Sequence, residues 1–104
     1  MTWKNIALHG AQSIARLCGI YEISDTHRLP NGAFKVKVLE RAQDYLAVPN
    51  VCVRGPDGSP EWISGLGQNE REALQDAVAR VMSKLGQRDE WQEDELVWSD
   101  PRDF

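Results

Sequence analysis

Asp25 and His27 are the residues whose types and spacing come closest to a catalytic pair. They are two positions apart, so on a strand both side chains would leave the same face and the carboxylate could orient the imidazole. A catalytic site also needs a nucleophile or a metal beside such a pair, and the sequence nominates neither. We therefore interpret the two residues as part of a polar turn and predict that the protein is not an enzyme. A pH-dependent activity lost in His27→Ala would indicate the opposite.

The remaining histidine and the two cysteines do not have the spacing of a metal site. His9 stands alone, and Cys18 and Cys52 are far apart in the chain. Zinc and redox motifs place their cysteines or histidines a few residues from one another. We predict no metal and no cofactor, with both thiols reduced and buried among apolar neighbours.

Gly65 and Gly67 precede a predicted helix, the position at which a glycine-rich loop can hold a phosphate. The longer glycine pattern and its Lys or Thr are missing, and Glu70 and Glu72 would repel a phosphate. We interpret the two glycines as residues that allow a sharp turn from a strand into the helix.

The basic residues that gather in one stretch are Lys35, Lys37 and Arg41. They could contact a nucleic acid, which is our alternative function and predicts affinity that falls steeply with salt. Lysines that point outward from a strand also pair with glutamates on neighbouring strands or protect a sheet edge from aggregation. We favour this structural role.

The last eighteen residues, 87–104, combine acidity with large aromatic side chains. They hold seven acidic and two basic residues, a net charge of −5, whereas the whole chain carries −4. Trp91, Trp98 and Phe104 lie among these acids, and each large side chain represents about 2 kcal/mol of apolar burial. Either they pack on the body of the protein, which we favour, or they bind a partner. For the second case these three are the predicted partner-binding residues.

A predicted helix over residues 69–85 organises the rest of the chain. Its apolar residues recur every three or four positions. Asn69 can cap the first turn, and Gly86 can end the helix in the left-handed conformation. The same spacing predicts a second amphipathic helix over residues 3–18, with Gly10 as a weak point in its interior.

Between the two predicted helices the pattern alternates as in strands. Residues 20–27 and 33–40 alternate around a Leu-Pro-Asn-Gly turn and form the clearest predicted hairpin. Residues 51–53 and 61–64 read as further strands separated by a turn rich in Pro and Gly. Residues 41–50 read as a connection that could include a short extended piece.

The chain of 104 residues, 41% hydrophobic and 27% charged, has the size and composition of one globular domain. We expect an α+β domain over residues 1–86 and an acidic tail over 87–104, either docked or mobile. No apolar run approaches the roughly 20 residues that span a bilayer, and residues 1–10 lack the pattern of a secretory signal. We therefore expect a cytoplasmic protein that does not bind membranes.

The run Glu61-Trp62-Ile63-Ser64-Gly65-Leu66-Gly67 and the helix after it resemble the last strand and closing helix of double-stranded RNA-binding domains. The resemblance covers residues 33–86 and implies a sheet covered on one face by helices. Those domains hold phosphates with lysines that open the closing helix, and this chain has Asn69, Glu70, Arg71 and Glu72 there. The resemblance therefore implies a related fold without the RNA-binding surface.

These observations predict an antiparallel sheet of three or four strands with two helices on one face, in the order α-β-β-β-β-α. The predicted function is that of a non-catalytic protein-interaction or regulatory module of bacterial or phage type. The partner would bind the open sheet face, a sheet edge or the tail, and the acidic tail would attract a basic partner. Pairing of two copies through an exposed strand stays open.

Overall fold

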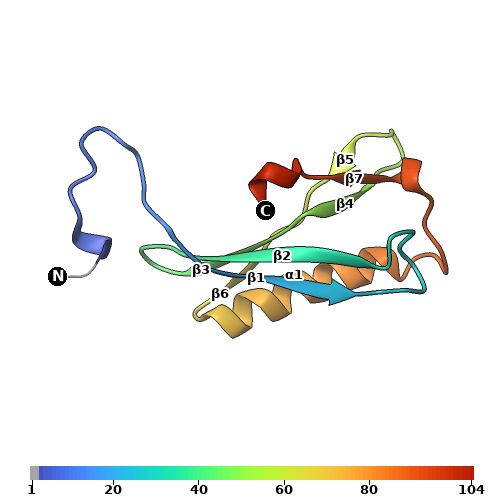
Figure 1. Cartoon of the computed structure of the whole chain (residues 1–104), viewed down its shortest axis with the longest axis horizontal. Helices are drawn as coiled ribbons and strands as arrows, with labels where there is room; N and C mark the ends of the chain where they lie inside the picture. The colour runs from blue at the N-terminus through green and yellow to red at the C-terminus, as the bar shows by residue number, and fades with distance from the viewer. Residues whose placement is uncertain (1–2) are drawn as a thin grey trace.

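A computed structural model describes residues 3–104, which form two antiparallel sheets and one α-helix (Figure 1). The strands are β1 (Arg16–Ser24), β2 (Ala33–Glu40), β3 (Tyr45–Pro49), β4 (Val51–Arg54), β5 (Pro60–Glu61), β6 (Gly65–Gly67) and β7 (Leu96–Trp98), and the helix is α1 (Glu70–Leu85). Short 3-10 helices cover Trp3–Asn5, Glu93–Glu95 and Pro101–Asp103. In the described chain, no helix has the length and apolar character needed to cross a membrane.

The two sheets share one long strand that changes sheet in its middle. The first sheet has the order β1-β2-β3-β6 and the second the order β5-β4-β7, and only Asn50 separates β3 from β4. The Asn50 N–H donates to the carbonyl of Lys35, and its side-chain oxygen accepts from the Lys35 N–H, both at 2.8 Å. Its carbonyl accepts from the N–H of Ser99, also at 2.8 Å. Asn50 therefore connects β2 to the segment that follows β7.

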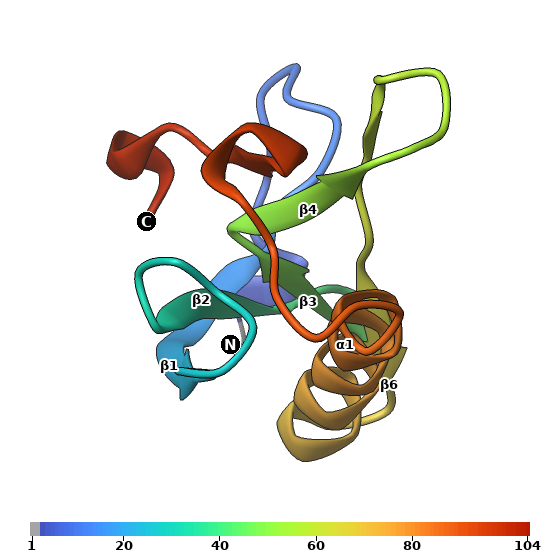
Figure 2. The same cartoon turned by 90° about the vertical axis from the view of Figure 1, so that its right-hand side faces the viewer.

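Helix α1 covers one face of the first sheet, as the end-on view shows (Figure 2). Its start is confirmed, because the side chain of Asn69 accepts from the N–H of Glu72 at 2.9 Å. The predicted left-handed stop is wrong: Gly86 has φ −67° and ends the helix in a right-handed conformation. The residues that α1 buries completely recur every four positions: Ala73, Ala77, Val81 and Leu85.

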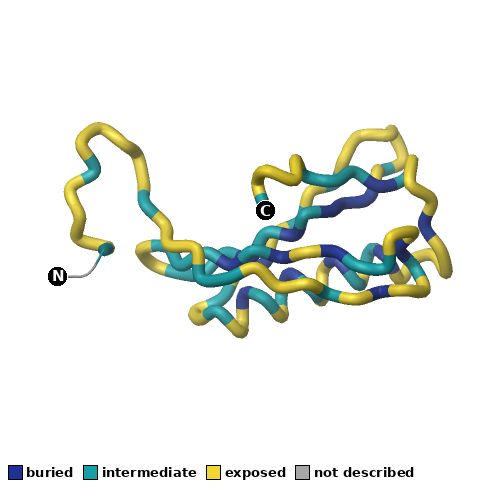
Figure 3. Tube along the Cα trace, viewed as in Figure 1, coloured by how far each residue is buried: buried dark blue, intermediate teal, exposed yellow. Residues whose placement is uncertain are grey.

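The core lies between α1, the middle strands and the C-terminal segment (Figure 3). It takes alternate residues of β2, the valines of β4 and two side chains of the last eighteen residues. Its buried members include Phe34, Val36, Val38, Ala47, Val51, Val53, Trp91 and Leu96. Burial of about 25 cal/mol per Å² of apolar surface makes this shared core the main source of stability.

The prediction of two helices is wrong, because residues 3–18 do not form a helix. Trp3–Asn5 is a single 3-10 turn, and Arg16 already begins β1. Between them, His9 and Gly10 have φ of 50° and 97°, and the Ala11 N–H bonds to the Leu8 carbonyl at 3.0 Å, which closes a turn. An amphipathic stripe needs a surface to cover it, and the segment extends away from the body in Figure 1.

The strand predictions were right in kind and wrong in extent. The hairpin of β1 and β2 is confirmed, and its turn is closed by the Gly32 N–H to the Leu29 carbonyl at 3.1 Å. Residues 41–50 include the full strand β3, and the strand predicted over 61–64 is replaced by β5 and β6, which belong to different sheets. The single predicted sheet is therefore two.

Candidate protein-interaction surface

Asp25 and His27 lie in the turn after β1 and not on a strand. The Asp25 carboxylate accepts from the Arg28 backbone N–H at 3.2 Å and lies 3.5 Å from the Arg28 guanidinium. Asp25 is buried, whereas His27 is exposed. The contacts of Asp25 hold the turn together, and in the described chain no three His, Cys, Asp or Glu side chains gather in a way that could hold a metal ion.

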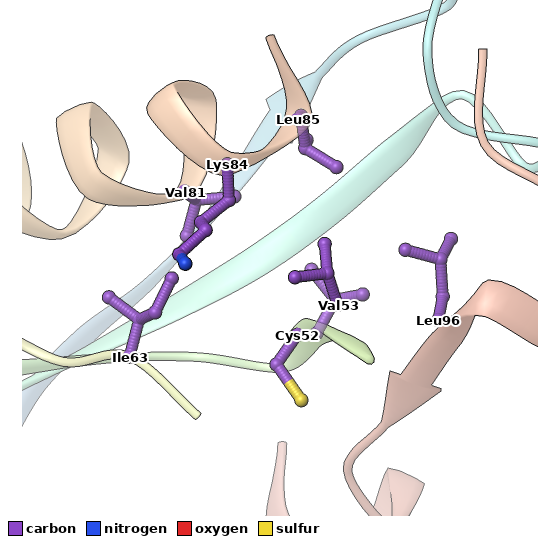
Figure 4. A pocket seen from close by; sticks show the side chains of 8 residues that line it. Cys52, Val53, Ile63, Val81, Lys84, Leu85 and Leu96 are labelled. Atoms are coloured by element: carbon purple, nitrogen blue, oxygen red, sulfur yellow. The ribbon is translucent and has the colours of Figure 1, made fainter. Parts of the chain in front are cut away.

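A small cavity lies between α1 and β4 (Figure 4). Its volume is about 10 Å³, and its lining is apolar, with Val53, Val81 and Leu85 among the contributing side chains. This is the space of a single water molecule, and the apolar wall offers such a water too few partners. Cys52 also borders it, and burial raises the pKa of this thiol. The cavity is a packing gap and not a ligand site.

Gly65 and Gly67 bring β6 into contact with α1. A Cβ atom on either residue would collide with the helix backbone at Ala73. The glycines therefore do more than permit a turn, because they let the helix approach the sheet without an intervening side chain. Because side chains alternate along a strand, that of Leu66 between them points to the opposite face of the sheet.

The three basic residues of the alternative function have different surroundings. Arg41 forms two hydrogen bonds of 2.6 Å with Asp44 at the turn between β2 and β3. The Lys37 ammonium donates to the Asp103 carbonyl at 3.1 Å and lies 4.8 Å from the centroid of the Phe104 ring. Lys35 is exposed and lies opposite Glu22 in the register of β1 and β2.

The tail packs against the body through Trp91 and β7. Trp91 is 4% exposed, and its indole N–H donates to the Leu85 carbonyl at 2.9 Å. Its backbone N–H donates to the Arg28 carbonyl at 2.9 Å. Trp91 therefore fills the space between the end of α1 and the turn after β1, and it offers no exposed face to a partner.

Trp98 and Phe104 keep part of their surface exposed. Trp98 ends β7 and lies opposite Val51 of β4. Phe104 lies against Lys37, which points to the side of the sheet opposite α1, because the flanking Val36 and Val38 belong to the core. In Figure 1 the C-terminal segment and α1 accordingly lie on opposite sides of the first sheet.

Four leucines form a row across the helix-free face of the first sheet. The register places Leu17 opposite Leu39, Leu39 opposite Leu46, and Leu46 opposite Leu66. One residue thus comes from each strand, and we call this set the leucine row. Leu17 and Leu66, at its two ends, are each 53% exposed, and Ile20 beside Leu17 is 42% exposed. A contiguous apolar surface of this kind is typical of an interaction site.

The leucine row could not be found by reading along the chain. Its four members come from four separate segments, so only the strand register brings them together. The sequence contained one signal of the row: Leu39 occupies the next outward position of β2 after Lys35 and Lys37.

The two edges of this sheet are finished differently. At β6 the N–H of Leu66 donates to the carboxylate of Asp76 on α1 at 3.0 Å. A helix side chain therefore occupies that edge. β1 forms the other edge, and six of its nine residues are exposed.

Searches against family models, curated proteins and solved structures returned no match for this chain. The resemblance of residues 33–86 to double-stranded RNA-binding domains stays a prediction.

Proposed function

We propose that this domain is a non-catalytic interaction module that binds another protein through the leucine row. The observation that carries the proposal is the exposure of Leu17 and Leu66 at the two ends of an apolar row that crosses all four strands. Exposed apolar area costs free energy in water, about 25 cal/mol per Å², and a partner that covers it recovers this cost. A regulatory or accessory role in the cytoplasm is the setting we propose.

The charges beside the leucine row define the chemistry of the partner. The C-terminal segment reaches the same face at Lys37 and carries the exposed acids Asp100 and Asp103. It belongs to the stretch 87–104, whose net charge is −5. A partner with an apolar centre and basic residues at its border fits this surface, because opposite charges at a rim increase the association rate.

Nucleic-acid binding has less support from the same geometry. Arg41 is held by Asp44, and Lys37 is held by the carbonyl of Asp103. Lys35 alone is a weak attraction for a phosphate backbone, because affinity grows with the number of phosphates neutralised.

The test is affinity capture from a nuclease-treated lysate of the source organism with wild type and Leu66→Lys, and identification of the bound proteins by mass spectrometry. Leu66 is 53% exposed and points to the face of the sheet opposite α1, so the charge should leave the fold intact while it disrupts an apolar contact. Ile6→Lys is the matched control, because Ile6 is 45% exposed but lies on the N-terminal segment. Binding of the purified partner is then measured by calorimetry.

We expect Leu66→Lys to weaken this binding about tenfold or more and Ile6→Lys to leave it unchanged. A partner retained equally by both variants would contradict the proposal. Recovery of nucleic acid from untreated lysate, with salt-sensitive affinity reduced in Lys35→Ala, would favour the alternative.

A further inference from the structure

The outer edge of β1 meets the leucine row at Leu17, and its amide groups are oriented for pairing. The Asp25 N–H donates to the Gly32 carbonyl at 2.8 Å, so Asp25 points its backbone groups toward β2. Backbone groups in an antiparallel pair alternate between the two sides of a strand. Those of Ser24, Glu22 and Ile20 therefore point away from β2 toward solvent.

An irregularity in β1 determines which backbone groups before Ile20 also point outward. The register against β2 shifts by one residue between Leu17 and Gly19, which marks a β-bulge at Cys18. Because of the extra residue, the next outward backbone groups after Ile20 belong to Leu17. The outward residues Leu17, Ile20 and Glu22 are thus evenly spaced along the edge, with Ile20 in the middle.

We propose that a second copy of this chain occupies this edge, so that β1 pairs with β1 of the other copy in antiparallel orientation about a two-fold axis at Ile20. Ile20 then faces Ile20 of the second copy, and Leu17 faces the aliphatic part of Glu22. Arg16, next to Leu17, points to the opposite face of the sheet and bonds to Glu40 of β2 at 2.9 Å, so it stays outside this contact. An axis at Glu22 would instead place two carboxylates together.

The second copy explains two features of the edge together. Two exposed apolar side chains, those of Leu17 and Ile20, come into contact with the other strand. Pairing also removes the long exposed edge, which natural proteins otherwise protect with charges or short strands. The first sheets of the two copies then form one sheet of eight strands, with both leucine rows on the same face.

The test compares Glu22→Pro with Glu22→Thr by sedimentation velocity at concentrations from micromolar to several hundred micromolar. Proline removes the outward N–H of Glu22, which makes no bond to β2, so the fold should tolerate it at an edge. Threonine removes the same carboxylate but keeps the N–H and favours a strand. Circular dichroism and thermal melts check that both variants fold.

We expect wild type to form a dimer, Glu22→Pro to weaken it at least about tenfold, and Glu22→Thr to change it no more than about threefold. If Glu22→Pro does not fold, Ile20→Glu replaces it, because two carboxylates would then face each other at the axis. A wild type that stays monomeric throughout, or a dimer that Glu22→Pro or Ile20→Glu leaves unchanged, overturns the inference. Leu66 lies on the opposite edge of the sheet, so the result of the partner-binding test with Leu66→Lys does not depend on whether the dimer forms.

Discussion

At the scale of single residues, the close packing of β6 against α1 depends on the absence of a side chain at Gly65. A Cβ atom on Gly65 would lie 2.3 Å from the backbone nitrogen of Ala77 and 2.5 Å from the carbonyl oxygen of Ala73. Neither backbone atom can move without displacing α1. Gly65 is therefore a packing requirement, and its position before the helix does not reflect phosphate binding.

Gly65→Ala should lower the free energy of unfolding by about 1–3 kcal/mol, because the added methyl group forces the helix away from the sheet. Urea denaturation followed by circular dichroism measures this. Gly19→Ala is the control: its Cβ would meet only side-chain atoms, at 3.6 Å or more, so a change within about 0.5 kcal/mol is expected. Equal losses in the two variants would contradict this account.

At the scale of elements, α1 both covers the sheet and finishes one of its edges. The Asp76 carboxylate accepts from the Leu66 N–H and forms an ion pair of 3.1 Å with Arg80. The hydrogen bond from Leu66 and the nearby guanidinium hold the pKa of Asp76 below its ordinary value of 3.8. The edge at β6 is thus closed by a charged group that titrates in acid.

The sign of the resulting pH dependence follows from this lowered pKa. The ionised carboxylate stabilises the folded chain above the pKa of the unfolded state, and this contribution is lost as the pH falls through the folded pKa. Asp76→Asn should therefore be less stable than wild type at neutral pH and should lose less stability on acidification from about pH 5 to 2.5. Thermal melts across this range measure the difference.

Asp89→Asn is the control for Asp76→Asn, since it removes an exposed carboxylate in the tail. Its pH profile should follow that of wild type. If Asp76→Asn also followed wild type, the bond to the edge of β6 would have no role in acid stability.

At the scale of the whole molecule, the last eighteen residues belong to the same core as the sheet and the helix. β7 adds a strand to β4, and Trp91 bonds both to Leu85 at the end of α1 and to Arg28 in the first hairpin. The tail therefore stabilises the first hairpin, β4 and the end of α1. Deletion of the tail would expose core side chains and could not serve as a clean test of partner binding.

Trp91→Ala should lower the free energy of unfolding by about 3–5 kcal/mol, because it leaves a large cavity and an indole hydrogen bond is lost. Trp98→Ala should cost clearly less, since Trp98 keeps part of its surface exposed. Guanidinium denaturation followed by circular dichroism compares them. Similar losses in both variants would show that Trp91 does not have the central position described.

The sequence was sufficient to predict those elements that depend on interactions between neighbouring residues. The helix after Asn69 and the first hairpin could be predicted from the sequence, because a cap, a repeated apolar spacing and a turn act within a few residues. The sequence left open whether Trp91 packs on the body or binds a partner, and the structure places it in the core.

Tertiary structure decided whatever depends on distant partners. Residues 3–18 have helical spacing, yet no surface covers their stripe, and β1 takes over at Arg16. The leucine row exists only because strand register aligns four separate segments. Burial and register are properties of contacts between remote residues, so a sequence read along one chain determines its local elements but not the faces and edges on which function depends.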